Sequence, residues 1–63
     1  MAPSGAGPYR VMLVDDSAVI RGLLARALKD DPTIEVTASV GDGLAAVERA
    51  KRGDIEVVVL DIE

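Results

Sequence analysis

The sequence predicts an α/β fold, with a small parallel sheet of three strands and two helices. Three observations support this prediction. Apolar segments that suit strands alternate with helical segments, in the order β-α-β-α-β. Such alternation is typical of crossover connections and a parallel sheet. The chain has 63 residues, so it is one domain at most, and a chain of about 60 residues is near the lower limit for an independent core.

Composition excludes several classes of function. The chain has no cysteine and no histidine, so a disulfide, a zinc site of the usual kind and a Ser-His-Asp triad are excluded within it. The net charge of -4 argues against nucleic acid as a partner, because phosphate binding needs a basic face. No apolar run approaches the roughly 20 residues that span a bilayer. We therefore expect a soluble, cytoplasmic chain with no membrane insertion.

The first strand is predicted over residues 9–14, after a leader over residues 1–8. The leader is rich in Pro, Gly, Ala and Ser, which is typical of disorder. From Val11 to Val14 the next segment is continuously apolar. Such a run favours a strand that is buried on both faces. The ordered domain is therefore expected over residues 9–63.

The first helix is predicted to begin after Ser17, whose side chain can cap it. Pro32 is expected to end it, because the residue before a proline is biased away from helical geometry. Apolar residues recur at helical spacing in this segment, which predicts one buried face. They are Ile20, Leu23, Leu24, Ala27 and Leu28.

Residues 34–40 alternate, which predicts a half-exposed edge strand with its apolar residues on one side and its polar residues on the other. Asp42 is a candidate cap for a second, weaker helix over residues 43–52. Gly53 is a natural stop for that helix. Residues 55–60 form the last predicted strand.

The character of each strand predicts its place in the sheet. The first is apolar throughout and belongs in the centre, the second is amphipathic and belongs at an edge, and the third lies on the other side of the first. The predicted order is 2-1-3. In open α/β sheets ligands bind at the carboxyl ends of the strands where the strand order reverses, here between the first and third strands.

Three carboxylates are expected at that point, because Asp15 and Asp16 end the first strand and Asp61 ends the third. Neighbouring strands lie about 4.8 Å apart, so the three acids would repel one another unless a cation lies among them. No Lys or Arg directly follows either strand. A hard divalent cation, Mg²⁺ or Mn²⁺, fits such oxygen ligands. The alternative is that Asp16 merely forms the turn or caps the following helix.

The segments VMLVDDSAVIRGLLARAL, DPTIEVTASVGDGLAAVERA and DIEVVVLDIE resemble the first half of a response-regulator receiver domain, a flavodoxin-like fold. Within that family, VDDSAVIR and LDIE most resemble the receiver of the chemotaxis protein-glutamate methylesterase. The resemblance implies that Asp61 is the phosphoacceptor for a sensor histidine kinase. It implies that Asp16 binds the metal directly, Asp15 binds it through water, and the backbone carbonyl of Glu63 is a further ligand.

The sequence also departs from the family. Receivers carry a hydroxyl residue after a fourth strand and a lysine after a fifth, and neither region is present in these 63 residues. We therefore expect a truncated receiver that is impaired in phosphotransfer and signalling. The methylesterase domain is also absent, so we expect no enzymatic activity from this chain.

Two alternatives remain open from the residues. Gly41, Gly43 and Ala46 form a G-x-G-x-x-A pattern, with an acid about 20 residues further on, as in a nucleotide-binding βαβ unit. Alternatively, the chain is a self-associating structural fragment without signalling activity. The third strand has the composition of a central strand, and an open apolar edge is a template for another chain. This predicts a homodimer through that strand.

Overall fold

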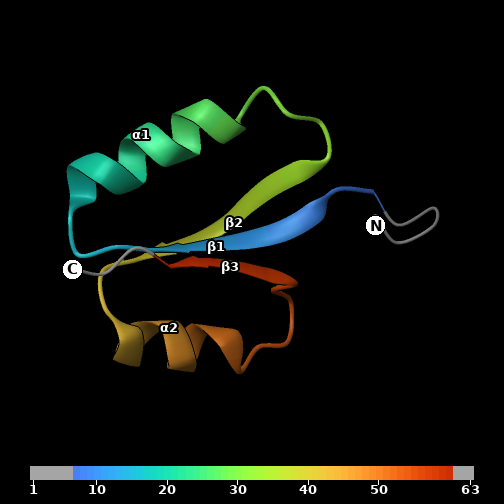
Figure 1. Ribbon diagram of the computed structural model, residues 1–63. Helices are drawn as coiled ribbons and strands as arrows, with labels where there is room; N and C mark the ends of the chain where they lie inside the picture. The colour runs from blue at the N-terminus through green and yellow to red at the C-terminus, as the bar shows by residue number, and fades with distance from the viewer. Residues whose placement is uncertain (1–6, 61–63) are drawn as a thin grey trace.

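The computed structural model describes residues 7–60 and has the element order β-α-β-α-β. The elements are β1 (Tyr9–Val14), α1 (Ala18–Leu28), β2 (Ile34–Val40), α2 (Gly43–Ala50) and β3 (Val57–Leu60). Both pairings of β1 are parallel, and the strand order is β2-β1-β3 (Figure 1). The predicted fold class and strand order are confirmed. The second helix ends two residues earlier than expected, and the third strand begins two residues later.

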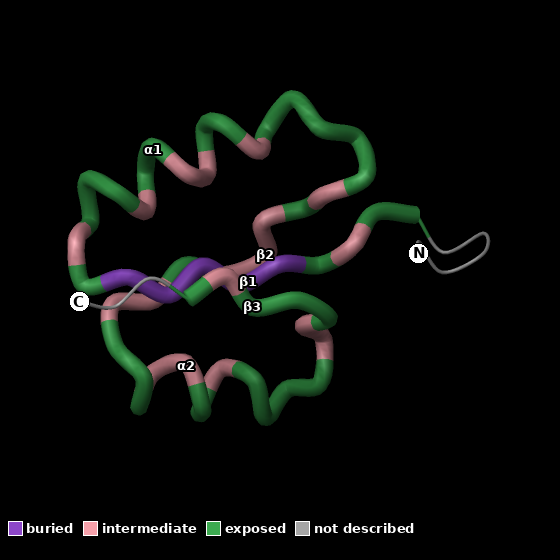
Figure 2. Tube along the Cα trace, viewed as in Figure 1, coloured by how far each residue is buried: buried purple, intermediate pink, exposed green. Residues whose placement is uncertain are grey.

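The two helices lie on opposite faces of the sheet (Figure 1). Each packs close to β1 and β2, whereas no Cα atom of either helix lies within 8 Å of a Cα atom of β3 among the described residues. The central strand is therefore covered on both faces and along both edges, which explains why it forms the core. Val11, Met12, Leu13 and Val14 are each at most 4% exposed, and they form the continuous buried segment in Figure 2.

Both helices begin at the predicted caps. The Ser17 hydroxyl accepts a hydrogen bond from the Ile20 amide at 3.3 Å, and the Asp42 carboxylate accepts one from the Ala45 amide at 2.7 Å. Each cap satisfies a donor that the first helical turn leaves without a partner. After α2 the chain reverses through Gly53, whose φ of 77° lies in the left-handed region that glycine adopts without strain.

The buried face of α1 differs from the predicted one. Its half-buried residues are Arg21, Leu24, Ala25 and Leu28, which recur at the spacing of one helical face. Three residues predicted to be buried are exposed: Ile20 at 38%, Leu23 at 59%, and Ala27. The apolar stripe is wider than the contact with the sheet, so its Ile20–Leu23 flank faces away from β1 and β2.

β2 contains an irregularity that the alternating sequence does not reveal. Val11 pairs with Val36, but the next residue, Met12, pairs with Ala38, so Thr37 is an extra residue in β2. Successive residues of β1 point to opposite faces, so Val36 and Ala38 also lie on opposite faces. The prediction that all apolar residues of this strand share one side is therefore wrong. The bulge lets β2 contribute apolar side chains to both helical layers.

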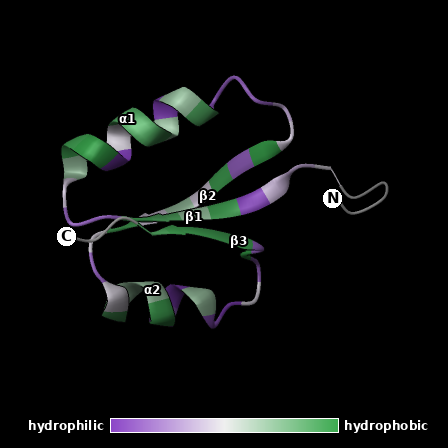
Figure 3. Ribbon diagram, viewed as in Figure 1, coloured by the Kyte–Doolittle hydropathy of each residue, from purple (hydrophilic) through white to green (hydrophobic). Residues whose placement is uncertain are grey.

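β3 is apolar but exposed. Val57, Val58 and Leu60 are 41%, 49% and 65% exposed, although β3 is coloured as hydrophobic along its length in Figure 3. The cause is its position, because β3 pairs only with β1, and no Cα atom of either helix lies within 8 Å of its Cα atoms in residues 7–60.

Most of the predicted leader, residues 1–8, falls outside the described residues. The division into a leader and a domain over residues 9–63 stays a prediction.

Candidate functional site

The carboxyl ends of β1 and β3 lie side by side, as the sequence predicts. The last paired residues are Val14 in β1 and Leu60 in β3, and Asp15 follows Val14 directly. Asp61 follows Leu60 in the sequence, but Asp61 and Glu63 both lie outside the described residues. The structure therefore positions Asp15 and Asp16 of the predicted acidic site. It also places β3, the strand that Asp61 follows in the sequence, next to β1.

Asp15 is held in place at three of its polar groups. Its amide donates to the Val40 carbonyl at 3.2 Å, which ties the ends of β1 and β2 together. Its carboxylate Oδ1 accepts a hydrogen bond from the Ser17 amide at 2.8 Å. Its carbonyl oxygen accepts one from Nη1 of Arg21 at 2.6 Å. The residue is only 4% exposed, so its second carboxylate oxygen is fixed in direction.

Asp16 has the opposite environment. It is exposed, and its side chain accepts no hydrogen bond from the described residues. The two neighbouring acids therefore offer one fixed carboxylate and one that is free to reorient. Carboxylate oxygens of this kind suit a hard divalent cation, so the residues present fit the predicted metal. Within residues 7–60 no group of three or more His, Cys, Asp or Glu residues could hold a metal, and the predicted ligand set also includes Asp61 and Glu63, outside the described residues.

Arg21 is a basic residue at this site that the sequence analysis missed. Arg21 does not directly follow a strand, and its side chain reaches the end of β1 from α1. Its position was readable from the sequence, because Arg21 is three residues before Leu24 and seven before Leu28, on the half-buried face. The guanidinium also lies against Gly41, where an added Cβ would be 3.0 Å from Nη1.

The glycine-rich turn before α2 is capped from within the chain. The carboxylate of Asp42 accepts the Ala45 amide at 2.7 Å, and this is one of the amides that a bound pyrophosphate would need. A carboxylate at that position would also repel a phosphate. The turn therefore has the features of a capped helix start, which argues against the nucleotide-binding alternative.

Two ion pairs hold the segment that leads into β3. Arg49 binds Asp54 through both carboxylate oxygens, at 2.6 and 3.1 Å, and these bonds lower the pKa of Asp54. The backbone amide of Arg10 donates to Glu56 at 3.0 Å and lowers the pKa of that carboxyl, and the Arg10 side chain adds an ion pair. These pairs fix β3 beside β1 at the end of the sheet opposite the acids.

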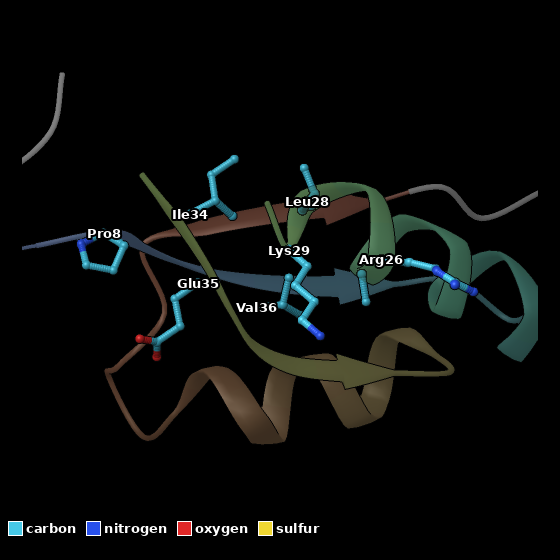
Figure 4. A pocket seen from close by; sticks show the side chains of 8 residues that line it. Pro8, Arg26, Leu28, Lys29, Ile34, Glu35 and Val36 are labelled. Atoms are coloured by element: carbon cyan, nitrogen blue, oxygen red, sulfur yellow. The ribbon is translucent and has the colours of Figure 1, made fainter. Parts of the chain in front are cut away.

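A groove of about 720 Å³ also lies at that opposite end (Figure 4). Its apolar lining comes from Leu28 at the end of α1 and from Ile34 and Val36 at the start of β2. Parallel strands have all their carboxyl ends at one edge, so this groove and the Asp15–Asp16 turn are separated by the length of the sheet. The groove is not part of the predicted site.

Comparison with known proteins finds strong similarity to one class of enzyme. The chain is 65% identical over 57 residues to protein-glutamate methylesterase/protein-glutamine glutaminase 1 of Rhodospirillum rubrum, a match that covers 90% of this chain. It is 62% identical over 60 residues to the protein-glutamate methylesterase/protein-glutamine glutaminase of Azospirillum brasilense, covering 95% of this chain. No family model and no solved structure matches the chain.

The chain spans about 15% of the length of these two curated relatives. These 63 residues do not include the catalytic domain, as the sequence analysis expects. Within residues 7–60 neither helix is long and apolar enough to cross a membrane. Over about nine tenths of its length the chain is thus similar to a receiver-like segment of the protein-glutamate methylesterases, which confirms the resemblance that its motifs indicate.

Proposed function

We propose that this chain is a phosphoacceptor segment of a cytoplasmic chemotaxis response regulator. In this proposal Asp15, Asp16, Asp61 and the carbonyl of Glu63 bind Mg²⁺ or Mn²⁺, and Asp61 accepts a phosphoryl group from a sensor histidine kinase. The observation that supports it most is the pairing of Val14 with Leu60. That pairing puts the buried Asp15 at the end of the strand beside the one that Asp61 follows. The similarity to methylesterases supports the same function.

The two described acids suit different roles in this proposal. Asp16 is exposed and unbonded within the described residues, so it is free to bind a cation directly. Asp15 already uses Oδ1 for the Ser17 amide, so its remaining oxygen suits a water molecule of the cation's hydration shell. A bound cation supplies positive charge that neutralises the phosphoryl oxygens during transfer.

The proposed transfer is a displacement at phosphorus. A carboxylate oxygen of Asp61 forms a new P–O bond while the bond from phosphorus to the donor nitrogen breaks, and the histidine leaves with that electron pair. The family's hydroxyl and lysine are not among these 63 residues. Losing one such electrostatic contact typically costs roughly 10²–10³ in rate, so we expect slow transfer and weak signalling output from this chain alone.

Metal binding is the first test. Mg²⁺ or Mn²⁺ is titrated into the wild-type chain, Asp16→Asn, an Asp16→Asn/Asp61→Asn double variant, and Asp30→Asn. Asp30 is an exposed acid after α1, at the other end of the sheet, so its variant is the matched control for lost charge. We expect wild type and Asp30→Asn to bind alike, Asp16→Asn to bind more weakly, and the double variant to bind least. Equal affinity in all four would refute the site.

Phosphorylation is tested separately, with acetyl phosphate or a phosphorylated kinase as the donor. Intact-mass measurement is expected to show slow addition of one phosphoryl group that requires the cation and is lost in Asp61→Asn. Fast, stoichiometric labelling would show that the hydroxyl and the lysine are dispensable. Labelling that persists in Asp61→Asn would place the acceptor elsewhere.

We also propose that this chain forms a homodimer through β3. The supporting observation is the exposure of Val57, Val58 and Leu60 on a strand that neither helix covers within the described residues. Pairing of two β3 strands about a twofold axis would make them antiparallel and would satisfy the backbone groups along the open edge.

Light scattering and sedimentation over a range of concentrations test the dimer. Val58→Lys is expected to abolish it, because a charge would then lie in the interface, and to reduce the folded fraction. Val19→Lys is the control, since Val19 is 71% exposed on α1, away from β3. A folded wild-type chain whose mass does not change with concentration and equals that of a monomer would rule the dimer out.

A further inference from the structure

Arg21 connects the three segments that surround the acidic turn. Its backbone amide donates to the Ser17 carbonyl at 3.0 Å, as the first turn of α1 requires. The Arg21 side chain extends back to the end of β1, where its Nη1 donates to the Asp15 carbonyl at 2.6 Å. The same nitrogen lies against Gly41, at the end of β2. Arg21 therefore links α1, the end of β1 and the end of β2 at one point.

From this geometry we infer that Arg21 is a positioning residue, which raises the metal affinity of the proposed site by holding the Asp15 carbonyl. The inference rests on the proposed function and concerns a residue outside the ligand set. The Asp15 amide donates to the Val40 carbonyl, and Asp15 Oδ1 accepts from the Ser17 amide. The bond from Arg21 to the Asp15 carbonyl is therefore the third hydrogen bond that holds Asp15 in the turn. Asp16 follows Asp15 directly and its side chain accepts no hydrogen bond from the described residues, so the position of its backbone depends on how firmly Asp15 and Ser17 are held.

Gly41 makes room for this arrangement. An ideal Cβ at position 41 would lie 3.0 Å from Nη1 of Arg21, which is tighter than ordinary van der Waals contact. An alanine there would push the guanidinium away by a few tenths of an ångström and lengthen its bond to the Asp15 carbonyl. The glycine is therefore explained by the arginine that it faces, since φ at this position is not positive.

Arg21 has two opposite effects on the affinity for a cation, so whether affinity rises or falls when Arg21 is removed tests the inference. The guanidinium carries a positive charge near the acids, and a like charge weakens cation binding. The hydrogen bond to Asp15 orders the turn, and partners that orient metal ligands typically strengthen binding by about 10- to 100-fold. Removing Arg21 raises affinity if only its charge matters and lowers affinity if positioning dominates.

The experiment titrates Mn²⁺ and Mg²⁺ into the wild-type chain, Arg21→Met, Arg21→Lys, Gly41→Ala and Arg26→Met. Arg26 is an exposed residue of the same helix and has no acidic partner within the described residues, so Arg26→Met is the control for lost charge. We expect Arg21→Met to bind about tenfold more weakly, Arg21→Lys and Gly41→Ala to fall between it and wild type, and Arg26→Met to bind at least as well as wild type. Unchanged or tighter binding by Arg21→Met would overturn the inference.

A second readout needs no metal. Hydrogen exchange of the Ser17 amide, measured by NMR, reports whether its bond to Asp15 Oδ1 persists. We expect faster exchange in Arg21→Met than in Arg26→Met, with amides in the middle of β1 unchanged. If β1 exchanges faster as well, Arg21 supports the whole fold and its specific role in the turn is refuted. If the wild-type chain binds no cation, the proposed metal site fails with the inference, whereas binding that is equal in wild type and Arg21→Met refutes the positioning role alone.

Discussion

Leu13→Ala is expected to remove much of the stability of this chain, and Leu44→Ala very little. Leu13 is 0% exposed in the middle of β1, where it pairs with Ser39 on one side and Val59 on the other. Leu44 is 78% exposed at the start of α2. Both substitutions truncate a leucine to alanine, so a difference between their effects on the free energy of unfolding reflects the different burial of the two side chains.

The magnitude follows from the two environments. Truncating a buried leucine to alanine costs about 2–5 kcal/mol, the sum of the lost transfer free energy and the cavity that remains. Folded domains have roughly 0.05–0.15 kcal/mol of stability per residue, so a chain of this length has roughly 3–9 kcal/mol to lose. Leu13→Ala thus removes a large part of the total, whereas an exposed substitution changes stability by less than about 0.5 kcal/mol.

Urea denaturation followed by far-ultraviolet circular dichroism measures both variants at one protein concentration. A lower midpoint with an unchanged slope is expected for Leu13→Ala, and a midpoint close to that of wild type for Leu44→Ala. Comparable losses in the two variants would refute the conclusion that β1 forms the core and that the apolar face of α2 contributes little.

Three further predictions concern the helices and the charged pairs. Asp42→Ala should lower the free energy of unfolding by about 1 kcal/mol through loss of the α2 cap, and unchanged thermal denaturation would contradict this. Gly53→Ala should destabilise the fold by about 1 kcal/mol, because φ at this position is 77°. Gly22 lies in the interior of α1 with no atom within 4 Å of an added Cβ, so Gly22→Ala should stabilise the fold by about 0.5–1 kcal/mol. A change of the same sign in both variants would be inconsistent with the structure. The pKa values of Asp54 and Glu56 are lowered in the folded state, so their contribution is complete above the ordinary carboxyl pKa of about 4 and is lost as pH falls below it. Urea midpoints measured between pH 2 and 6 (roughly the range in which carboxyls titrate) should therefore depend less on pH in Asp54→Asn and Glu56→Gln, and an unchanged pH dependence would refute these pairs.

Interactions between neighbouring residues determine several parts of this fold, and those parts could be predicted from the sequence. The caps at Ser17 and Asp42 and the central place of the apolar first strand depend on neighbouring residues or on continuous hydrophobicity, and the structure confirms them. Gly53 lies in the turn after α2, which ends earlier, at Ala50. The bulge at Thr37 could not be predicted in this way. It depends on how β2 must match β1 while it presents apolar side chains to both helical layers, which is a property of the pairing.

Burial was the weaker part of the sequence prediction, because hydrophobicity identifies side chains that prefer burial but not those that find a partner. The four residues of β3 are as apolar as residues 11–14 of β1, yet β1 lies between two strands and under two helices, whereas β3 pairs with β1 alone within residues 7–60. The flank of α1 formed by Ile20 and Leu23 is exposed for a similar reason. The apolar stripe of α1 is wider than the surface that contacts the sheet, so part of the stripe stays exposed.

The contrast between Asp15 and Asp16 shows how the fold can give two identical neighbours different chemical properties. Asp15 is the first residue beyond a strand that is covered on both faces, so its backbone and one carboxylate oxygen enter the hydrogen-bond network of β2, Ser17 and Arg21. Asp16 is one residue further along the turn, beyond the reach of that network within the described residues, and is exposed. The turn at the end of a buried central strand thus provides one fixed and one exposed carboxylate, which suit the two different roles in the proposed metal site. The sequence reveals only that both residues are aspartates.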